Sequence, residues 1–175
     1  IKLLGNTFIN AVNAVNILAD AISNSDLTVS SKLFSIGIAV AVTNSMVFIT
    51  DESKIISTNG DILIRSNAEG NATVTTGTTT KAENNKLPLS FAAGVSVLTS
   101  KAEIGEDTRI ESGGSVNLIA NGANIGGGNA TVFLIGGGAN AITLAVYTGI
   151  SNVLAKADGT IIAKSSSTER SLIPI

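Results

Sequence analysis

The sequence predicts an all-β fold, a right-handed parallel β-helix (β-solenoid) built from degenerate repeats of about 55 residues. The first reason is internal similarity, because most of segment 36–66 recurs in segment 91–120. The second is composition, with 44% hydrophobic residues but only 3% aromatic ones. Similarity at a fixed spacing indicates stacked units that cannot fold alone. The matched pairs are Val40 with Val95, Val42 with Val97, Ile49 with Ile104, Ile55 with Ile110, Ser57 with Ser112 and Gly60 with Gly114.

The 175 residues form one domain's length of chain, and we divide it into repeats at about 1–35, 36–89, 90–135 and 136–175. The apolar content is mostly Ala, Val, Ile and Leu, and the polar content is mostly Ser, Thr and Asn. Such residues suit pleated surfaces that repeat. Neither end has the polar capping unit that solenoids need for solubility. We therefore expect a solenoid segment that belongs to a longer chain or a fibre.

The first repeat allows two interpretations. Its segment 6–24 carries an apolar stripe at helical spacing, with Asn6 as a candidate helix cap. The same segment also resembles later stretches that we expect to be strands, and its Asn, Val and Ile residues are mediocre helix formers. The strand interpretation is favoured, and the helix remains the alternative.

The second repeat begins with alternating large and small apolar residues. Ile36, Ile38, Val40 and Val42 alternate with Gly37, Ala39 and Ala41, which indicates a strand. We expect the large side chains to fill the core, where matching Val and Ile residues of successive repeats would stack. The small side chains are expected to pack under a neighbouring segment or a partner chain.

A charged corner follows each of these strands, at residues 50–54 and 105–109. Each corner contains two acidic residues, a hydroxyl residue and a basic residue, which is typical of a solvated turn. Stacked carboxylates can also bind hard cations, so calcium binding is an alternative for Asp51, Glu52, Glu106 and Asp107. The solvated turn is favoured, because loose charge clusters are usually exposed.

Sharp turns then precede the next strands. They lie at 59–61, 113–115 and 158–159, and each contains glycine, which we expect because the bend requires positive φ. The motif Gly-Asn-Ala-Thr-Val occurs at 70–74 and again at 128–132. This second occurrence predicts that Gly70 aligns with Gly128 and that the repeat extends into the linking strands. Segment 81–88 is the expected place for a loop that leaves the solenoid.

One stretch matches a dinucleotide-binding fingerprint. Residues 136–141 fit Gly-x-Gly-x-x-Ala after a predicted strand, and Asp158 lies about 20 residues beyond Gly138. However, the segment after the glycines favours a strand, and the chain has no alternation of strands and helices. A lone glycine fingerprint is a weak signal, so no cofactor-binding residue is assigned.

No catalytic or metal-ligating residue is assigned either. The chain has no histidine and no cysteine, which removes histidine-based triads and the imidazole and thiolate metal ligands. A carbohydrate-active β-helix enzyme would have to use carboxylates and bases, for which the candidates are Asp51, Glu52, Glu106, Asp107, Lys54 and Arg109. Their periodic positions favour a structural role, so we expect a protein that is not an enzyme.

Charge and hydropathy limit the partners. The net charge of −2 shows no basic stripe for nucleic acid, and no apolar run reaches the length of a membrane span. The first four residues are too short for a signal peptide. Two Asn-x-Thr sequons, at Asn71 and Asn129, are sites where sugar could be attached.

The repeats resemble those of very large secreted bacterial adhesins, the filamentous-haemagglutinin-like and leukotoxin-like exoproteins. The resemblance lies in residues 39–44, 100–104, 60–62 and 113–116. It implies a secreted, non-catalytic structural or adhesive module of a bacterial surface adhesin or extracellular fibre. Its partners would be like modules or copies of itself along the fibre, and a host or neighbouring-cell surface. The alternative is a self-assembling filament subunit joined end to end through open strand edges.

Overall fold

The structure is a computed structural model that describes residues 1–81, 87–135 and 140–173. The described residues form strands and turns and contain no helix. The strands are β1 (Lys2–Leu3), β2 (Phe8–Ala11), β3 (Val15–Ser31), β4 (Phe34–Ile49), β5 (Lys54–Ser57), β6 (Ile62–Lys81), β7 (Leu89–Ile104), β8 (Arg109–Ser112), β9 (Ser115–Ile135), β10 (Ile142–Ala157), β11 (Thr160–Ile162) and β12 (Ser165–Ile173).

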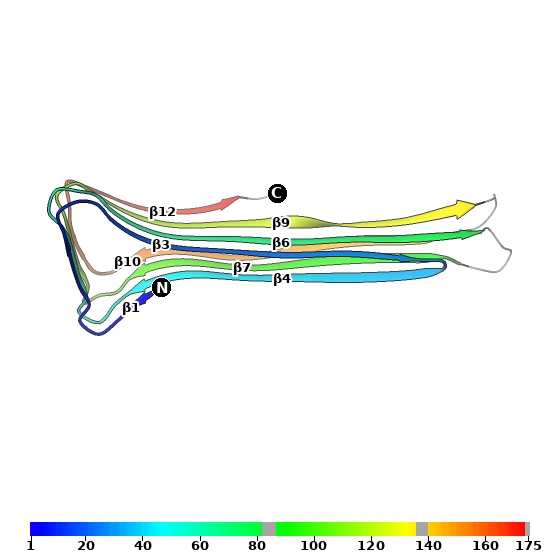
Figure 1. Cartoon of the computed structure of the whole chain (residues 1–175), viewed down its shortest axis with the longest axis horizontal. Coiled ribbons are helices and arrows are strands. Elements are labelled where there is room, and N and C mark those ends of the chain that lie inside the picture. Colours follow the sequence, from blue (N-terminus) through cyan, green and yellow to red (C-terminus); the bar gives the residue numbers. More distant parts are fainter. Residues whose placement is uncertain (82–86, 136–139, 174–175) are drawn as a thin grey trace.

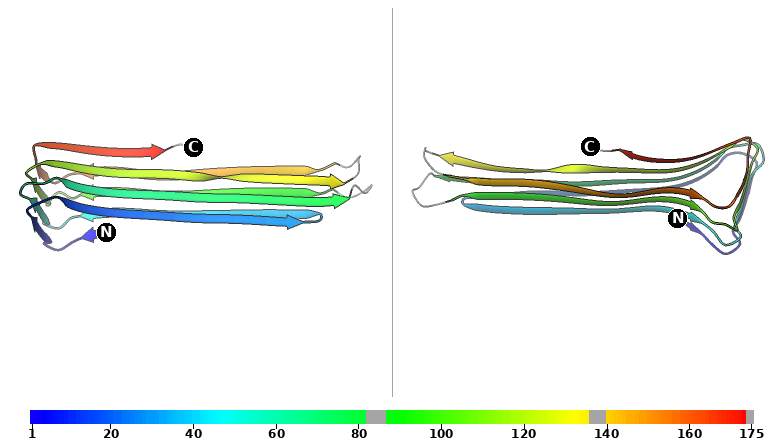
Figure 2. Two further views of the ribbon diagram at one scale, coloured as in Figure 1. Left: turned by 45° about the horizontal axis from the view of Figure 1, so that its top comes forward. Right: turned by 180° about the vertical axis from the view of Figure 1, so that it is seen from behind.

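The chain is a parallel β-solenoid, as the sequence predicts. Its strands form three parallel sheets, which we call sheet A (β1-β4-β7-β10), sheet B (β2-β5-β8-β11) and sheet C (β3-β6-β9-β12). Each coil runs through sheets A, B and C in turn and then stacks on the coil before it. Figures 1 and 2 show the consequence, a triangular end that contains sheet B and a long blade made of sheets A and C alone.

The pairing register confirms the repeat read from the sequence. Val40 pairs with Val95 and Ile55 pairs with Ile110, as the internal alignment predicts. After the next turn Ile62 pairs with Val116, so the later coil is one residue shorter at this turn. The same alignment requires this, because it matches Ile55 with Ile110 but Gly60 with Gly114. Parallel strands at constant register satisfy the backbone groups of each inner coil on both sides.

The second Gly-Asn-Ala-Thr-Val motif does not follow this register. Gly70 pairs with Asn124, and Gly128 pairs with Val74. The predicted alignment of Gly70 with Gly128 is therefore wrong. Backbone pairing keeps the register that is set where Ile62 meets Val116, because a shift within the strand would break the ladder along its whole length.

The first repeat is built of strands, and the helical alternative for 6–24 is wrong. Residues 8–11 form β2 and residues 15–31 form β3. Strand β3 pairs with β6 along its whole length, from Val15 with Ile62 to Ser31 with Thr78. A partner strand at matching register overrides the weak helical stripe, because packing decides the state of a segment with mediocre helix formers.

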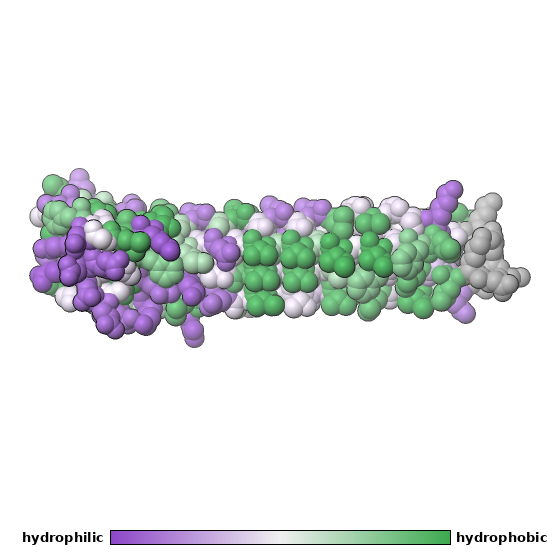
Figure 3. All heavy atoms as spheres, turned by 90° about the horizontal axis from the view of Figure 1, so that it is seen from below, coloured by the Kyte–Doolittle hydropathy of each residue, from purple (hydrophilic) through white to green (hydrophobic). Residues whose placement is uncertain are grey.

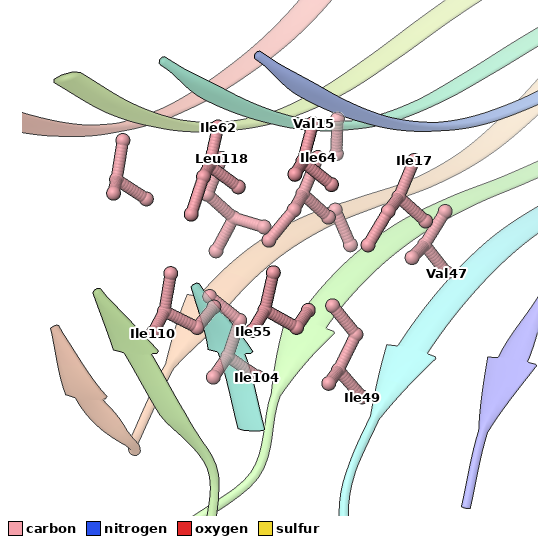
Figure 4. Packing of buried hydrophobic residues seen from close by; sticks show 13 residues of the cluster. Val15, Ile17, Val47, Ile49, Ile55, Ile62, Ile64, Ile104, Ile110 and Leu118 are labelled. Carbon is pink, nitrogen blue, oxygen red and sulfur yellow. The ribbon is translucent and has the colours of Figure 1, made fainter. Parts of the chain in front are cut away.

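Large side chains fill the core of the triangular end. Three sheets surround a space wide enough for whole Ile and Leu side chains, and Figure 4 shows these side chains pointing toward one another from strands of all three sheets. Ile55 and Ile110 are stacked here and fully buried, as predicted. The fully buried members also include Val47, Ile49, Ile62, Ile64, Ile104, Val116 and Leu118.

Small side chains fill the blade. Its apolar cluster consists of Ala39, Ala41, Ala72, Val74 and Ala92. The two sheets lie so close that a Cβ atom at Gly37 would lie 2.7 Å from Val74 Cγ1. The predicted packing of the small face under a neighbouring segment is confirmed, and that segment is β6 of the same chain.

Two hydroxyl clusters flank the alanines inside the blade. Toward the tip, Ser35 Oγ lies 2.9 Å from Thr78 Oγ1, and Thr76 Oγ1 lies 2.7 Å from Ser90 Oγ. Toward the triangular end, Ser66 Oγ lies 2.9 Å from Ser100 Oγ. These buried hydroxyl groups are paired with each other across the two sheets, which removes the cost of burying them.

The predicted burial of the large side chains of 36–42 is wrong. Ile36, Ile38, Val40 and Val42 point outward and are 46% to 58% exposed. Val40 and Val95 do stack on each other, but on the outer surface and not in a shared interior. The narrow gap between sheets A and C admits only Gly, Ala, Ser and Thr from β4, so the large residues of this alternating strand must lie outside.

Candidate interaction surface

The outward residues of sheet A form a regular apolar array on the blade. It has five rows across β4, β7 and β10, and all of its members except Thr148 are apolar. We call this surface the apolar array. Its rows are Phe34, Leu89 and Ile142; Ile36, Phe91 and Leu144; Ile38, Ala93 and Val146; Val40, Val95 and Thr148; and Val42, Val97 and Ile150.

The apolar array is exposed and contiguous. Figure 3 shows apolar side chains in rows over one face of the blade. On the two outer strands of the array, the large residues are between 44% and 58% exposed, with Val146 the least and Ile38 the most exposed. Toward the triangular end the array stops at a polar row of Asn44, Thr99 and Asn152. Apolar patches of this extent usually mark interaction sites.

The opposite face of the blade is mainly polar. Over the blade, most outward residues of β3 and β6 are Asn, Asp, Glu, Thr, Ser or Gly, with Ile22 as an apolar exception, and those of β9 include Asn129 and Thr131. The exposed large apolar residues on that side are scattered and do not form rows: Leu18 and Ile22 of β3, and Ile125, Phe133 and Ile135 of β9. Nearer the triangular end, Arg65 Nη2 lies 3.4 Å from Asp20 Oδ2. The two faces of the blade therefore differ, because exposed apolar residues form contiguous rows on sheet A and lie among polar residues on sheet C.

Both ends of the stack present strand edges. Strand β1 pairs with Phe48 and Ile49, and the Ile1 amine donates to Met46 O, so within the described residues no strand pairs with the part of that edge of β4 before Met46. At the other end, β10 pairs with β7 along its length and has no described partner on its outer edge. Unpaired edges are templates for another strand.

The charged corners do not form a shared site. Asp51 and Glu52 are exposed at positive φ, 58° and 60°, whereas the matching Glu106 and Asp107 form an ordinary turn closed by Thr108 N donating to Gly105 O. Among the described residues, no group of three or more acidic side chains lies close enough to hold a metal ion. The corner similarity read from the sequence therefore does not extend to backbone conformation.

The predicted positive φ at the glycines of 59–61, 113–115 and 158–159 is also wrong. Close packing of coils explains the glycines instead, because a Cβ atom at Gly60 would lie 2.3 Å from Ala14 N.

The two bases of these corners bind an acid that the sequence motifs do not indicate. Lys54 Nζ lies 3.3 Å from Glu111 Oε1, and Arg109 Nε donates to the same oxygen at 2.5 Å. The hydrogen bond from Arg109 and then that from Lys54 hold the pKa of Glu111 below its ordinary value of 4.5. The pairing of β5 with β8 could have revealed this, because it places Lys54 beside Arg109 and Ile56 beside Glu111. All three groups are on the outer surface of sheet B, where such pairs contribute little to stability.

The dinucleotide fingerprint lies largely outside the described residues, because it includes 136–139. The segment after it is strand β10, not a helix that could bind a phosphate at its N-terminus. Asp158 forms an ion pair with Lys156 and raises the pKa of that amine. The expected loop at 81–88 also lies mostly outside the described residues, at 82–86.

The two sequons are on the polar face of the blade. Asn71 on β6 is partly exposed, and its Oδ1 accepts a hydrogen bond of 3.0 Å from Thr73 Oγ1. Asn129 on β9 is exposed. Both side chains lie within strands and point away from the core, so neither contributes to the interior packing.

One hollow of about 320 Å³ lies where the core opens between β10 and β12. Its lining residues are Ser151, Val153, Arg170 and Leu172. They include no carboxylate and no second titratable group to pair with Arg170, so this hollow offers no acid–base pair for glycan chemistry.

In comparisons with protein-family models, curated proteins and solved structures, nothing matches this chain. Within its described part, the chain contains no helix that could cross a bilayer. The functional interpretation therefore depends on its own residues, and the apolar array and the open edges are the features to be explained.

Proposed function

We propose that the chain is a non-catalytic structural and adhesive module of a secreted bacterial surface adhesin or extracellular fibre. The observation that carries the proposal is the unbroken register of the stacked coils, from Val15 with Ile62 to Ile62 with Val116 and on to Ser166. Stacking at constant register makes a stiff rod whose length depends on the number of coils. A rod of this kind separates or presents surfaces without any chemical step.

The distribution of charged groups supports the same proposal. The acids and bases considered for catalysis lie at or beside coil corners, and none of them lines the hollow between β10 and β12. The resemblance of the repeats to those of large exoproteins agrees with a presenting role. Both features favour a surface that binds over one that converts a substrate.

An adhesion and turnover assay tests this function. Beads coated with the chain are expected to bind host cells or immobilised glycans and to release no product from those glycans. Asp51→Asn and Asp107→Asn should leave the binding unchanged, because both acids are exposed corner residues. Glycan cleavage by the chain that either substitution abolishes would overturn the proposal in favour of a carbohydrate-active enzyme.

A self-assembling filament subunit is the second candidate, and the outer edge of β10, which pairs with no other described strand, favours it. An edge of 16 residues with straight, flat backbone can pair with a strand of another copy. Electron micrographs of the native protein distinguish the candidates. A filament subunit would show boundaries repeating along a fibre, whereas an adhesin module would lie within one continuous long chain.

A further inference from the structure

We propose that the apolar array docks against the same array on a second copy of the chain, sheet face against sheet face. The array belongs neither to the core of the triangular end nor to that of the blade, because its side chains are on the outer face of sheet A. This inference does not depend on the proposed function, since the array is a surface separate from the strand edges that would extend a rod.

The spacing of the array favours a partner with the same spacing. Along each strand of this parallel sheet the outward residues recur about every 6.6 Å, and neighbouring strands lie about 4.8 Å apart. Figures 1 and 2 show that the blade strands run almost straight, with little twist. Flat sheets of this kind are typically stabilised by stacking, and an identical sheet matches both spacings at once.

The exposed area is large enough for a stable pair. The large array residues on β4 and β10, nine in all, are about half exposed. At roughly 150–200 Å² each, the lower part of the range for aromatic side chains, the nine residues present on the order of 700–900 Å². A standard protein interface buries about 800 Å² on each partner, whereas the largest apolar patch on a monomer is usually about 300–600 Å².

Charge does not oppose this contact. None of the array residues is charged, so two arrays bring no like charges together. The polar row of Asn44, Thr99 and Asn152 supplies a rim at one end. Charged residues of the blade, such as Asp20, Asp26 and Glu69, are on sheet C and would remain in water. An apolar centre with a polar rim is the usual anatomy of an interface.

The shape of the molecule selects an antiparallel arrangement. Figure 1 shows sheet A bending away from sheet C at the triangular end, so two copies with parallel strands would collide there. A two-fold axis across the strands places the triangular ends at opposite ends of the pair. Each array strand then faces the same strand of the partner, and Ala93 at the array centre faces Ala93 of the second copy.

Sedimentation of the chain and two lysine variants tests the docking. The wild-type chain is expected to be a dimer. Val95→Lys, on the central strand of the array, should raise the dimer dissociation constant at least about a hundredfold, because each copy would bury an unpaired charge. Thr75→Lys is the matched control, since Thr75 has the same branched shape and lies on the outer face of sheet C. It should leave the dimer unchanged.

Crosslinking tests the arrangement. The chain has no cysteine, so Ala93→Cys introduces a single thiol at the array centre. A short bifunctional maleimide should join two such copies and should not join copies carrying Thr75→Cys. A monomeric wild-type chain, or a dimer that Val95→Lys leaves intact, overturns the proposal. Binding of the monomer to phosphatidylcholine vesicles, lost in Val95→Lys, would overturn it in favour of a lipid surface.

Discussion

The triangular end and the blade are built from the same strands but bury opposite kinds of residue. At the triangular end three sheets enclose a wide interior, and Val47 and Ile49 of β4 are fully buried. In the blade only two sheets face each other, and β4 buries Ala39 and Ala41 while Val40 and Val42 are exposed. The distance between sheets, and not the hydrophobicity of a residue, decides which face of a strand is the core.

The largest expected effect is the loss of a large side chain at the triangular end. Ile110→Ala removes a fully buried side chain stacked between Ile55 and Ile161, and should lower the free energy of unfolding by about 2–5 kcal/mol. Ile38→Ala makes the same substitution on the blade, where the residue is 58% exposed. It should change the free energy of unfolding by less than about 0.5 kcal/mol.

Urea unfolding measures both variants, at protein concentrations low enough that copies do not associate. Equal losses of stability in the two variants would contradict the difference between the regions.

An intermediate effect is expected when a side chain is added inside the blade. A Cβ atom at Gly94 would lie 2.9 Å from the backbone oxygen of Ala72 and 3.2 Å from Tyr147 Cδ2. Gly94→Val should therefore force the sheets apart and cost about 1–3 kcal/mol. Ala93→Val, one residue earlier and on the outer face, should be nearly neutral. Thermal unfolding followed by circular dichroism compares the two, and a stable Gly94→Val chain would show that the blade is not tightly packed.

The smallest effect concerns Glu111 and the two bases beside it, on the outer surface of the triangular end. Because Arg109 and Lys54 lower the pKa of Glu111 in the folded chain, this carboxylate favours folding above about pH 4.5. That contribution disappears as the pH falls through the lowered pKa of the folded state. The wild-type chain should melt slightly higher than Glu111→Gln at neutral pH, and the difference should vanish in acid. A difference in melting temperature that persists in acid would contradict this account, because it would come from packing and not from the charge of Glu111.

Much of the fold could be predicted from the sequence. The repeat and the pairs that it aligns, such as Ile55 with Ile110, follow directly from internal similarity, because stacked coils require similar residues at matching positions. The assignment of faces in the blade could not be predicted in the same way. Both faces of 36–42 are apolar, so alternation alone does not say which is buried. The deciding residues, Val74 and Thr76 opposite Gly37, lie in a different sheet and far along the chain.

The candidate surface was predictable only in part. Internal similarity aligns the outward residues of β4 and β7, but alternation alone does not show that they lie on the outer face. Internal similarity does not align strand β10 with β4 and β7, although Leu144 and Val146 continue the rows of Phe91 and Ala93. The apolar array is visible only when three coils are placed side by side and their inner faces are known. A single strand carries too little information for that.

Thiol labelling along β4 most directly tests the change of face between the two regions. Cysteine replaces Val40, Ala41 or Val47 singly in the Val95→Lys chain, so that association of copies does not protect the array. The cysteine at position 40 should react at nearly the rate of a free thiol, and those at 41 and 47 should be protected by orders of magnitude, reacting only when the structure opens. Rapid labelling at 41 with protection at 40 would contradict the inversion and place the large residues in the core of the blade.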